Sequence, residues 1–203
     1  MDRALAVWSA LVLASMLALF LVPTSWFVGA TFAATACMLL AGWRLGAFAS
    51  RGPLRPRALA AGLASAAALY LVFLAGNAGV TALHPFGVGA ASEQSIYSLI
   101  ASPSNPIALQ AAVLLFDSAG YEGFFRGALM SRAEPRLGAW APAGVAAADA
   151  CMHLATLNPL WVATTFVADL CWGETCRRGG GLQASFVSHL AWDLLIFVVA
   201  PIR

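Results

Sequence analysis

Residues 107–130, "IALQAAVLLFDSAGYEGFFRGALM", are apolar over most of their length, yet they include the acid Glu122 and the base Arg126. A helix that spans a membrane needs about 20 mainly apolar residues. An ionisable side chain inside such a helix is costly, so it faces the bundle interior or a water-filled cavity and commonly marks function. This stretch therefore predicts a membrane-spanning helix with a polar site within it.

The composition places the whole chain in a membrane. Of its 203 residues, 61% are hydrophobic and only 10% are charged, whereas soluble domains carry about 25% charged residues. The mean hydropathy is +0.82. The net charge of +2 comes from arginines in short loops, which form no basic face, so nucleic acid is not an expected partner. We expect one integral membrane domain over residues 1–203.

Apolar segments along the chain predict an all-α, multi-pass helical bundle of about seven spans. The predicted spans are 4–22, 25–42, 57–82, 107–130, 140–156, 159–176 and 182–201. The part before residue 84 is nearly free of charge within its spans and is expected to be a scaffold. The motif-bearing part is 107–201. Between them, 84–106 is expected to be an external loop with a short amphipathic piece at 92–100.

The loops carry an orientation signal. Arginines cluster in 44–57, 132–136 and 177–178, while 84–106 contains neither lysine nor arginine. Seven spans put all three basic loops on one side, which the positive-inside rule assigns to the cytoplasm. The N-terminus is then cytoplasmic and the C-terminus is outside. The alanine-rich, lysine-free composition favours a bacterial source, and hence the cell (inner) membrane.

Three pairs of polar residues lie four positions apart inside the predicted spans. They are Glu122 with Arg126, Asp149 with His153, and His189 with Asp193. Residues four apart share one face of a helix. Each of the three helices therefore has a polar face, and we expect these faces to meet in a single shared site. Taken singly, each pair is also what a buried ion pair or a satisfied buried histidine would look like.

Other residues in these spans are given smaller roles. Asp117 lies five residues before Glu122, which is roughly 140° round a regular helix. Asp169 and Glu174 are expected to face the lumen or the interface. Gly123 and Gly127 form a G-x-x-x-G pattern, which is typical of close helix packing. The four cysteines lie in or beside apolar runs and are expected to be buried packing thiols: Cys37, Cys151, Cys171 and Cys176.

Two chemistries suit histidines with carboxylates. One is a metal site, since both residue types bind zinc. The other is water activation by a glutamate, with imidazoles polarising the carbonyl. The H-E-x-x-H signature of one large class of zinc proteases is absent. The spacing alone leaves both chemistries open.

Three stretches, "YEGFFRGAL", "DACMHLA" and "SFVSHLAWDLLIF", resemble the motifs of the CAAX protease and bacteriocin-processing (CPBP, or ABI) family of glutamic intramembrane endopeptidases. The family motifs read E-E-x-x-x-R, F-x-x-x-H, and H-x-x-x-N or H-x-x-x-D. The resemblance covers about 107–197. It implies a multi-span peptidase that needs no metal or organic cofactor.

The resemblance carries over residue by residue. Glu122 matches the second glutamate of the first motif, and Tyr121 stands where the first glutamate would be. Asp149 replaces the phenylalanine of the second motif. The remaining matches are Arg126, His153, His189 and Asp193.

In the expected reaction, Glu122 deprotonates a water with help from His153, and His189 stabilises the oxyanion. Asp193 orients His189, and Arg126 holds Glu122 in place. Asp149 is the other candidate for the missing carboxylate, with Tyr121 reshaping the site.

The expected substrate is a membrane-proximal peptide or the C-terminal tail of a membrane-anchored protein, reached from the lipid bilayer. Two alternatives stay open at this point. One is a catalytically inactive pseudoprotease that acts as a membrane binding or immunity protein. The other is a metal-dependent membrane hydrolase. The oligomeric state does not follow from the sequence.

Overall fold

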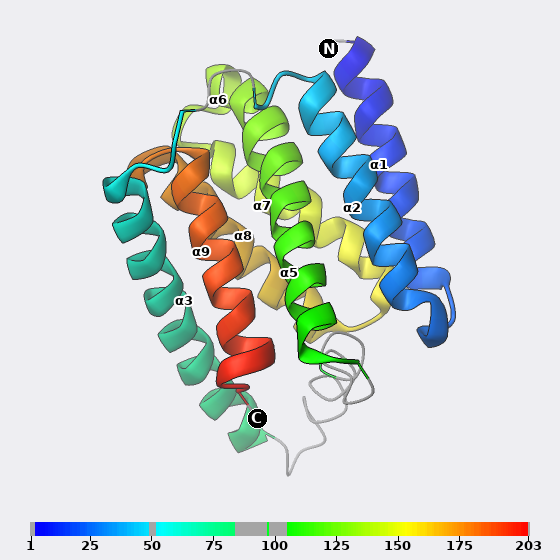
Figure 1. Ribbon diagram of the computed structural model, residues 1–203, viewed down its shortest axis with the longest axis vertical. Helices are drawn as coiled ribbons and strands as arrows, with labels where there is room; N and C mark the ends of the chain where they lie inside the picture. The colour runs from blue at the N-terminus through cyan, green and yellow to red at the C-terminus, as the bar shows by residue number, and fades with distance from the viewer. Residues whose placement is uncertain (1–2, 49–51, 84–96, 98–104, 203) are drawn as a thin grey trace.

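The helices follow the predicted spans closely. In the computed structural model, residues 3–48, 52–83, 97 and 105–202 are described (Figure 1). The chain is 89% helical, and no strand occurs in the described part. The helices are α1 Arg3–Leu21, α2 Phe27–Arg44, α3 Pro56–Leu83, α5 Ile107–Tyr121, α6 Ser131–Leu137, α7 Ala141–Met152, α8 Pro159–Gly179 and α9 Leu182–Leu194. Shorter turns are η1 Thr24–Trp26, η3 Glu122–Met130, η4 Gly138–Trp140, η5 His153–Thr156 and η6 Leu195–Val199.

The all-α membrane fold is confirmed, but the number of spans is not. Within the described ranges, four helical stretches are long and apolar enough to cross a bilayer: α1, α2, α3, and α9 with η6. The other predicted spans are divided into shorter pieces or carry charges. Most of the loop predicted at 84–106, with its amphipathic piece, lies outside the described residues.

The polar helices lie at the centre of the bundle. α9 packs against α3 on one side and against α5 and α8 on the other, while α2 packs against α1 and α5. α7 packs along α8. α9 therefore lies between α3 and α5, with α8 packed against it as well (Figure 1).

The basic loops gather at one end of the bundle. The N-terminus, the connection from α2 to α3, helix α6 and the turn from α8 to α9 lie at the upper end in Figure 1. The C-terminus lies at the opposite end. This arrangement agrees with the sidedness that the arginines predict. The compartment that each end faces stays a prediction.

The opening stretch of the sequence is not a regular α-helix. α5 ends at Tyr121 and continues as a π-helix over Glu122–Met130. π-helical hydrogen bonds run from i to i+5, so the turn is wider and the register of side chains shifts. Glu122, Phe124 and Arg126 are all buried, so this segment is enclosed on more than one face.

Small residues allow close helix crossings around the π-helix. A Cβ atom on Gly123 would collide with the ring of Phe48, and one on Gly42 would lie 3.0 Å from the backbone of Gly123. The close packing predicted for Gly123 is thereby confirmed. The prediction for the cysteines is wrong at Cys151, which is exposed on α7. The other three cysteines are partly buried, and all four are free.

A tight turn between α7 and α8 positions His153. α7 ends in the 3-10 turn η5, and Leu157 then takes a left-handed conformation with φ of 54°. Asn158 caps α8, since its side chain accepts a hydrogen bond from the backbone nitrogen of Trp161 at 3.1 Å. Pro159 begins α8, where its missing N–H costs nothing. His153 therefore sits in the last turn before the chain reverses.

Candidate active site

His189 on α9 is held from both sides by carboxylates. Its Nδ1 lies 3.0 Å from Oε1 of Glu122, and its Nε2 lies 3.5 Å from Oδ2 of Asp193. The indole of Trp172 stacks on the imidazole, with centroids 3.6 Å apart and planes 14° apart. The ring is thus fixed in position and orientation.

A further layer of polar groups surrounds this histidine. The hydroxyl of Ser118 donates to Oδ2 of Asp193 at 3.2 Å, and Thr35 donates to Oδ1 of Asp117 at 3.0 Å. Asp117, His189 and Asp193 each offer one ligand atom, and these atoms lie within 4.8 Å of one another. These three residues are therefore the set in the described chain that could hold a metal ion.

His153 forms the centre of a second polar group. Its Nδ1 lies 3.1 Å from the backbone oxygen of Asp149 and 3.7 Å from Oδ1 of the same residue. A carbonyl oxygen only accepts, so Nδ1 carries the proton and Nε2 is left with a lone pair. The rings of Phe20 and Trp161 lie 5.0 and 5.9 Å away, which restrains the imidazole.

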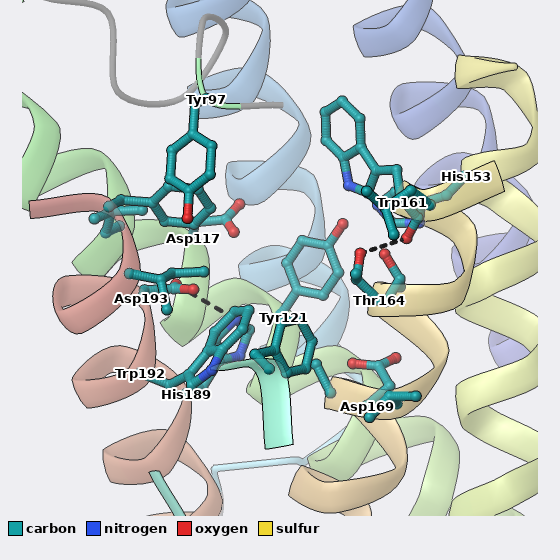
Figure 2. Close-up of a pocket in the computed structure, with 18 of the residues that line it drawn as sticks. Tyr97, Asp117, Tyr121, His153, Trp161, Thr164, Asp169, His189, Trp192 and Asp193 are labelled. Carbon is teal, nitrogen blue, oxygen red and sulfur yellow. Dashed lines mark hydrogen bonds and ion pairs between the residues drawn. The ribbon is translucent and has the colours of Figure 1, made fainter. Parts of the chain in front are cut away.

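Both groups open onto one cavity of about 370 Å³. Figure 2 shows His189 and Asp193 on one wall, His153 and Trp161 on the other, and the ring of Tyr121 between them. Asp117, Asp149 and Asp169 also line this cavity. Two histidines and four aspartates thus surround a space large enough for part of a peptide.

Arg126 departs from its predicted partner. Its Nη2 lies 2.5 Å from Oδ1 of Asp169 and 3.0 Å from the Asp169 backbone oxygen. Glu122, four residues before it, is 3.7 Å from Nη1. Asp169 was predicted to face the lumen or the interface; the interfacial position is wrong, because this residue is 1% exposed, lines the cavity and neutralises Arg126. Glu174 does lie at the surface, paired with Arg177 and Arg178.

The structure brings two of the three predicted polar pairs to one cavity, and the catalytic roles of these residues are untested. Asp149, His153, His189 and Asp193 share the cavity. Glu122 does not line it and lies behind His189 instead. Tyr121 does line it. The π-helix permits this, since Tyr121 ends the regular helix and Glu122 begins the wider turn.

The sequence analysis gave too little weight to three residues that line the site: Asp117, Asp169 and Trp172. Asp117 lies four residues before Tyr121, and that helical spacing was a signal that the two share a face. Asp169 and Trp172 lie three apart on α8 in the same way. The helices of the predicted scaffold also contribute to the cavity wall, for example through Met16 on α1 and Asn77 on α3.

The fold and the site together define a multi-pass membrane protein with a buried acid–histidine site of the kind that hydrolases use. Residues 103–195 match the sequence model of the family described as type II CAAX prenyl endopeptidase Rce1-like. This region is therefore similar to the Rce1-like, CPBP-type family of membrane proteases. No curated protein and no solved structure matches the chain.

Proposed function

We propose that this chain is an endopeptidase that hydrolyses a peptide bond inside the cavity between His153 and His189. The proposal rests on the placement of His153 and His189 on opposite walls of one cavity, where an acceptor holds Nδ1 of each ring. Such an arrangement leaves Nε2 of His153 free for chemistry, while Nε2 of His189 lies 3.5 Å from Oδ2 of Asp193. The match of residues 103–195 to a protease family supports the same reaction class.

His153 is the proposed general base. The backbone oxygen of Asp149 fixes its tautomer, so Nε2 can take a proton from a water molecule in the cavity. The carboxylate of Asp149 at 3.7 Å stabilises the imidazolium that forms. The water oxygen then bonds to the peptide carbon, and the proton held by His153 passes to the departing nitrogen as the C–N bond breaks.

The opposite wall is the proposed electrophilic side. Glu122 positions His189, and Arg126 lies close enough to Glu122 to keep its carboxylate charged. His189, protonated between the carboxylates of Glu122 and Asp193, donates through Nε2–H to the charge that develops on the carbonyl oxygen. Glu122 thus acts through His189, as a positioning residue, because it has no surface on the cavity.

The proposed substrate is a membrane-proximal peptide or the C-terminal tail of a membrane-anchored protein. Apolar residues of α1, α2 and α3 line much of the cavity, among them Met16, Phe27 and Phe73. An extended tail with an apolar anchor matches this lining better than a polar peptide does. The cell (inner) membrane, with the basic loops in the cytoplasm, is the proposed setting.

The test uses the full chain in lipid vesicles with a fluorescence-quenched peptide held in the bilayer by an apolar anchor. His153→Gln is expected to lower the cleavage rate by about 10²–10⁴-fold, the usual contribution of a general base. Glu174→Gln, at a surface ion pair, is the matched control and is expected to cleave at the wild-type rate. Equal cleavage by wild type and His153→Gln would rule out the mechanism. Binding of the peptide without cleavage by the wild type would favour the pseudoprotease alternative.

A further inference from the structure

We propose that residues 200–202 occupy one end of the cavity and compete there with a peptide that enters it. This segment follows η6, and its Ile202 lines the cavity together with Trp192 and Phe197. The competing ligand has the same chemistry as the segment, namely an extended peptide with a branched apolar side chain. The inference rests on the proposed function for the identity of that ligand, whereas the position of the segment does not depend on it.

The first argument is the path of the chain after α9 and η6. The helix ends at Ala200, which has φ of −143° and ψ of 69°. The C-terminus lies beside the lower end of α3 (Figure 1). Ile202 is only 9% exposed and belongs to an apolar cluster with Trp172 and Trp192. A segment that left the bundle directly would expose this side chain. The burial of Ile202 therefore places the segment against the cavity.

The second argument is that two tyrosine hydroxyls hold the backbone of the segment. Tyr70 on α3 donates to the backbone oxygen of Ala200 at 3.0 Å. The hydroxyl of Tyr97 accepts from the backbone nitrogen of Ile202 at 3.1 Å. Tyr97 lines the cavity, whereas Tyr70 lies outside the cavity lining. Tyr70 therefore fixes the segment alone, while the hydroxyl of Tyr97 can accept from the backbone of another extended peptide in the same way.

The third argument is that a row of rings joins this end of the cavity to the proposed reacting wall. Neighbouring ring centroids lie 5.7, 6.5, 5.5 and 3.6 Å apart in the row Tyr97, Phe197, Trp192, Trp172 and His189. Figure 2 shows Tyr97 on the side of the cavity that carries Asp193 and His189. An extended peptide advances about 3.3 Å per residue, so about six residues are long enough to span the row. A peptide bound at His189 along this row reaches the place that Ile202 occupies, and the two exclude each other.

The fourth argument is that few contacts hold the segment in place. One buried side chain and two hydrogen bonds oppose the conformational entropy of three ordered residues, and these contributions to the free energy are of similar size. The segment can therefore leave the cavity, and a bound peptide shifts the population toward the open form. If the segment is in place in about nine of ten molecules, the apparent affinity for the peptide is about tenfold below its intrinsic value.

The experiment measures the binding of a membrane-anchored fluorescent peptide to the full chain in lipid vesicles. The peptide carries a reduced, uncleavable bond in place of its scissile bond. Ile202→Asn removes the apolar contact of the segment, and Tyr70→Phe removes only the hydroxyl that holds it. Both variants are expected to bind the peptide about 5–10-fold more tightly than wild type. In the cleavage assay KM should fall by the same factor while kcat stays within about twofold, because a competing segment affects binding alone.

Val199→Asn is the matched control, because Val199 directly precedes the segment and is 70% exposed. It is expected to bind the peptide with wild-type affinity, and circular dichroism verifies that each variant is folded. Equal or weaker binding by Ile202→Asn than by wild type overturns the proposal. Tighter binding by Ile202→Asn and Tyr70→Phe without cleavage by any of the proteins supports the role of the segment and overturns the proposed peptidase. Cleavage with one KM for wild type and both variants overturns the role of the segment and leaves the peptidase standing.

Discussion

The buried pair Arg126–Asp169 is expected to hold the interior of the bundle together. Arg126 is 2% exposed and Asp169 is 1% exposed. Nη2 of Arg126 reaches Oδ1 of Asp169 at 2.5 Å and its backbone oxygen at 3.0 Å. Asp169→Asn preserves the size of the side chain and removes its charge, so it separates the ion pair from simple packing.

The structure sets the magnitude. Removing one partner of a buried ion pair costs about 3–5 kcal/mol, because an uncompensated charge is left behind. In Asp169→Asn the backbone oxygen still accepts from Arg126, and Glu122 still lies 3.7 Å away. We therefore expect Asp169→Asn to lower the free energy of unfolding by about 3 kcal/mol, at the lower end of that range. Arg126→Gln leaves Asp169 without its partner and is expected to cost about 4–5 kcal/mol.

The assay is a double-mutant cycle on the stability of the protein in detergent, followed by far-ultraviolet circular dichroism as SDS is added. The double variant Arg126→Gln, Asp169→Asn removes both charges, so its loss should be about 2–3 kcal/mol smaller than the sum of the single losses. Glu174 and Arg178 form a matched surface pair at 2.6 Å, with Arg178 71% exposed. Their coupling is expected to stay below about 1 kcal/mol. Additive losses at Arg126 and Asp169, within about 0.5 kcal/mol, would refute the reasoning.

Three other results are expected. Gly62→Ala should destabilise the fold in the same unfolding assay, because the added Cβ would lie 2.6 Å from the backbone oxygen of Ala184. Gly79→Ala on the same helix is the control and should be neutral, because its Cβ would meet nothing within 4 Å. Tyr121→Phe should retain the fold and have a cleavage rate within about threefold of wild type, because the hydroxyl donates only to the weak acceptor Sδ of Met16. A larger loss of rate in the vesicle assay would assign the hydroxyl to the reaction. Reporter fusions should place the basic loops and the N-terminus on the cytoplasmic side and the C-terminus outside, and a cytoplasmic C-terminal reporter would contradict the orientation.

The helices themselves were predictable from the sequence because their signals are local. A run of about 20 apolar residues must be helical in a bilayer, since each backbone polar group needs a partner within the segment. The predicted span 57–82 and the observed α3, Pro56–Leu83, differ by one residue at each end. The arginines also predicted that the loops carrying them lie at one end of the bundle, because charge is excluded from the apolar segments between these loops.

The sequence predicted which residue types form the site and that they lie inside the membrane-spanning segments. It predicted only part of the contacts between them. Spacing of four correctly reported that His189 and Asp193 share a face of α9. The same spacing at Glu122 and Arg126 gave the wrong principal contact, because the helix there is a π-helix and α8 brings in Asp169. Periodicity describes one helix, whereas an ion pair depends on which neighbour packs against it.

The sequence by itself determined that this protein is a helical membrane protein with acids and histidines buried in its C-terminal half. Hydropathy and the cost of burying charge are properties of residues and their near neighbours, so no tertiary structure is needed to see them. Only the tertiary structure decided that Glu122 lies behind His189 while Tyr121 faces the cavity. It also brought Asp117 from α5 beside Asp193 from α9. Those placements depend on helix rotation and crossing, which are set by packing between segments far apart in the chain.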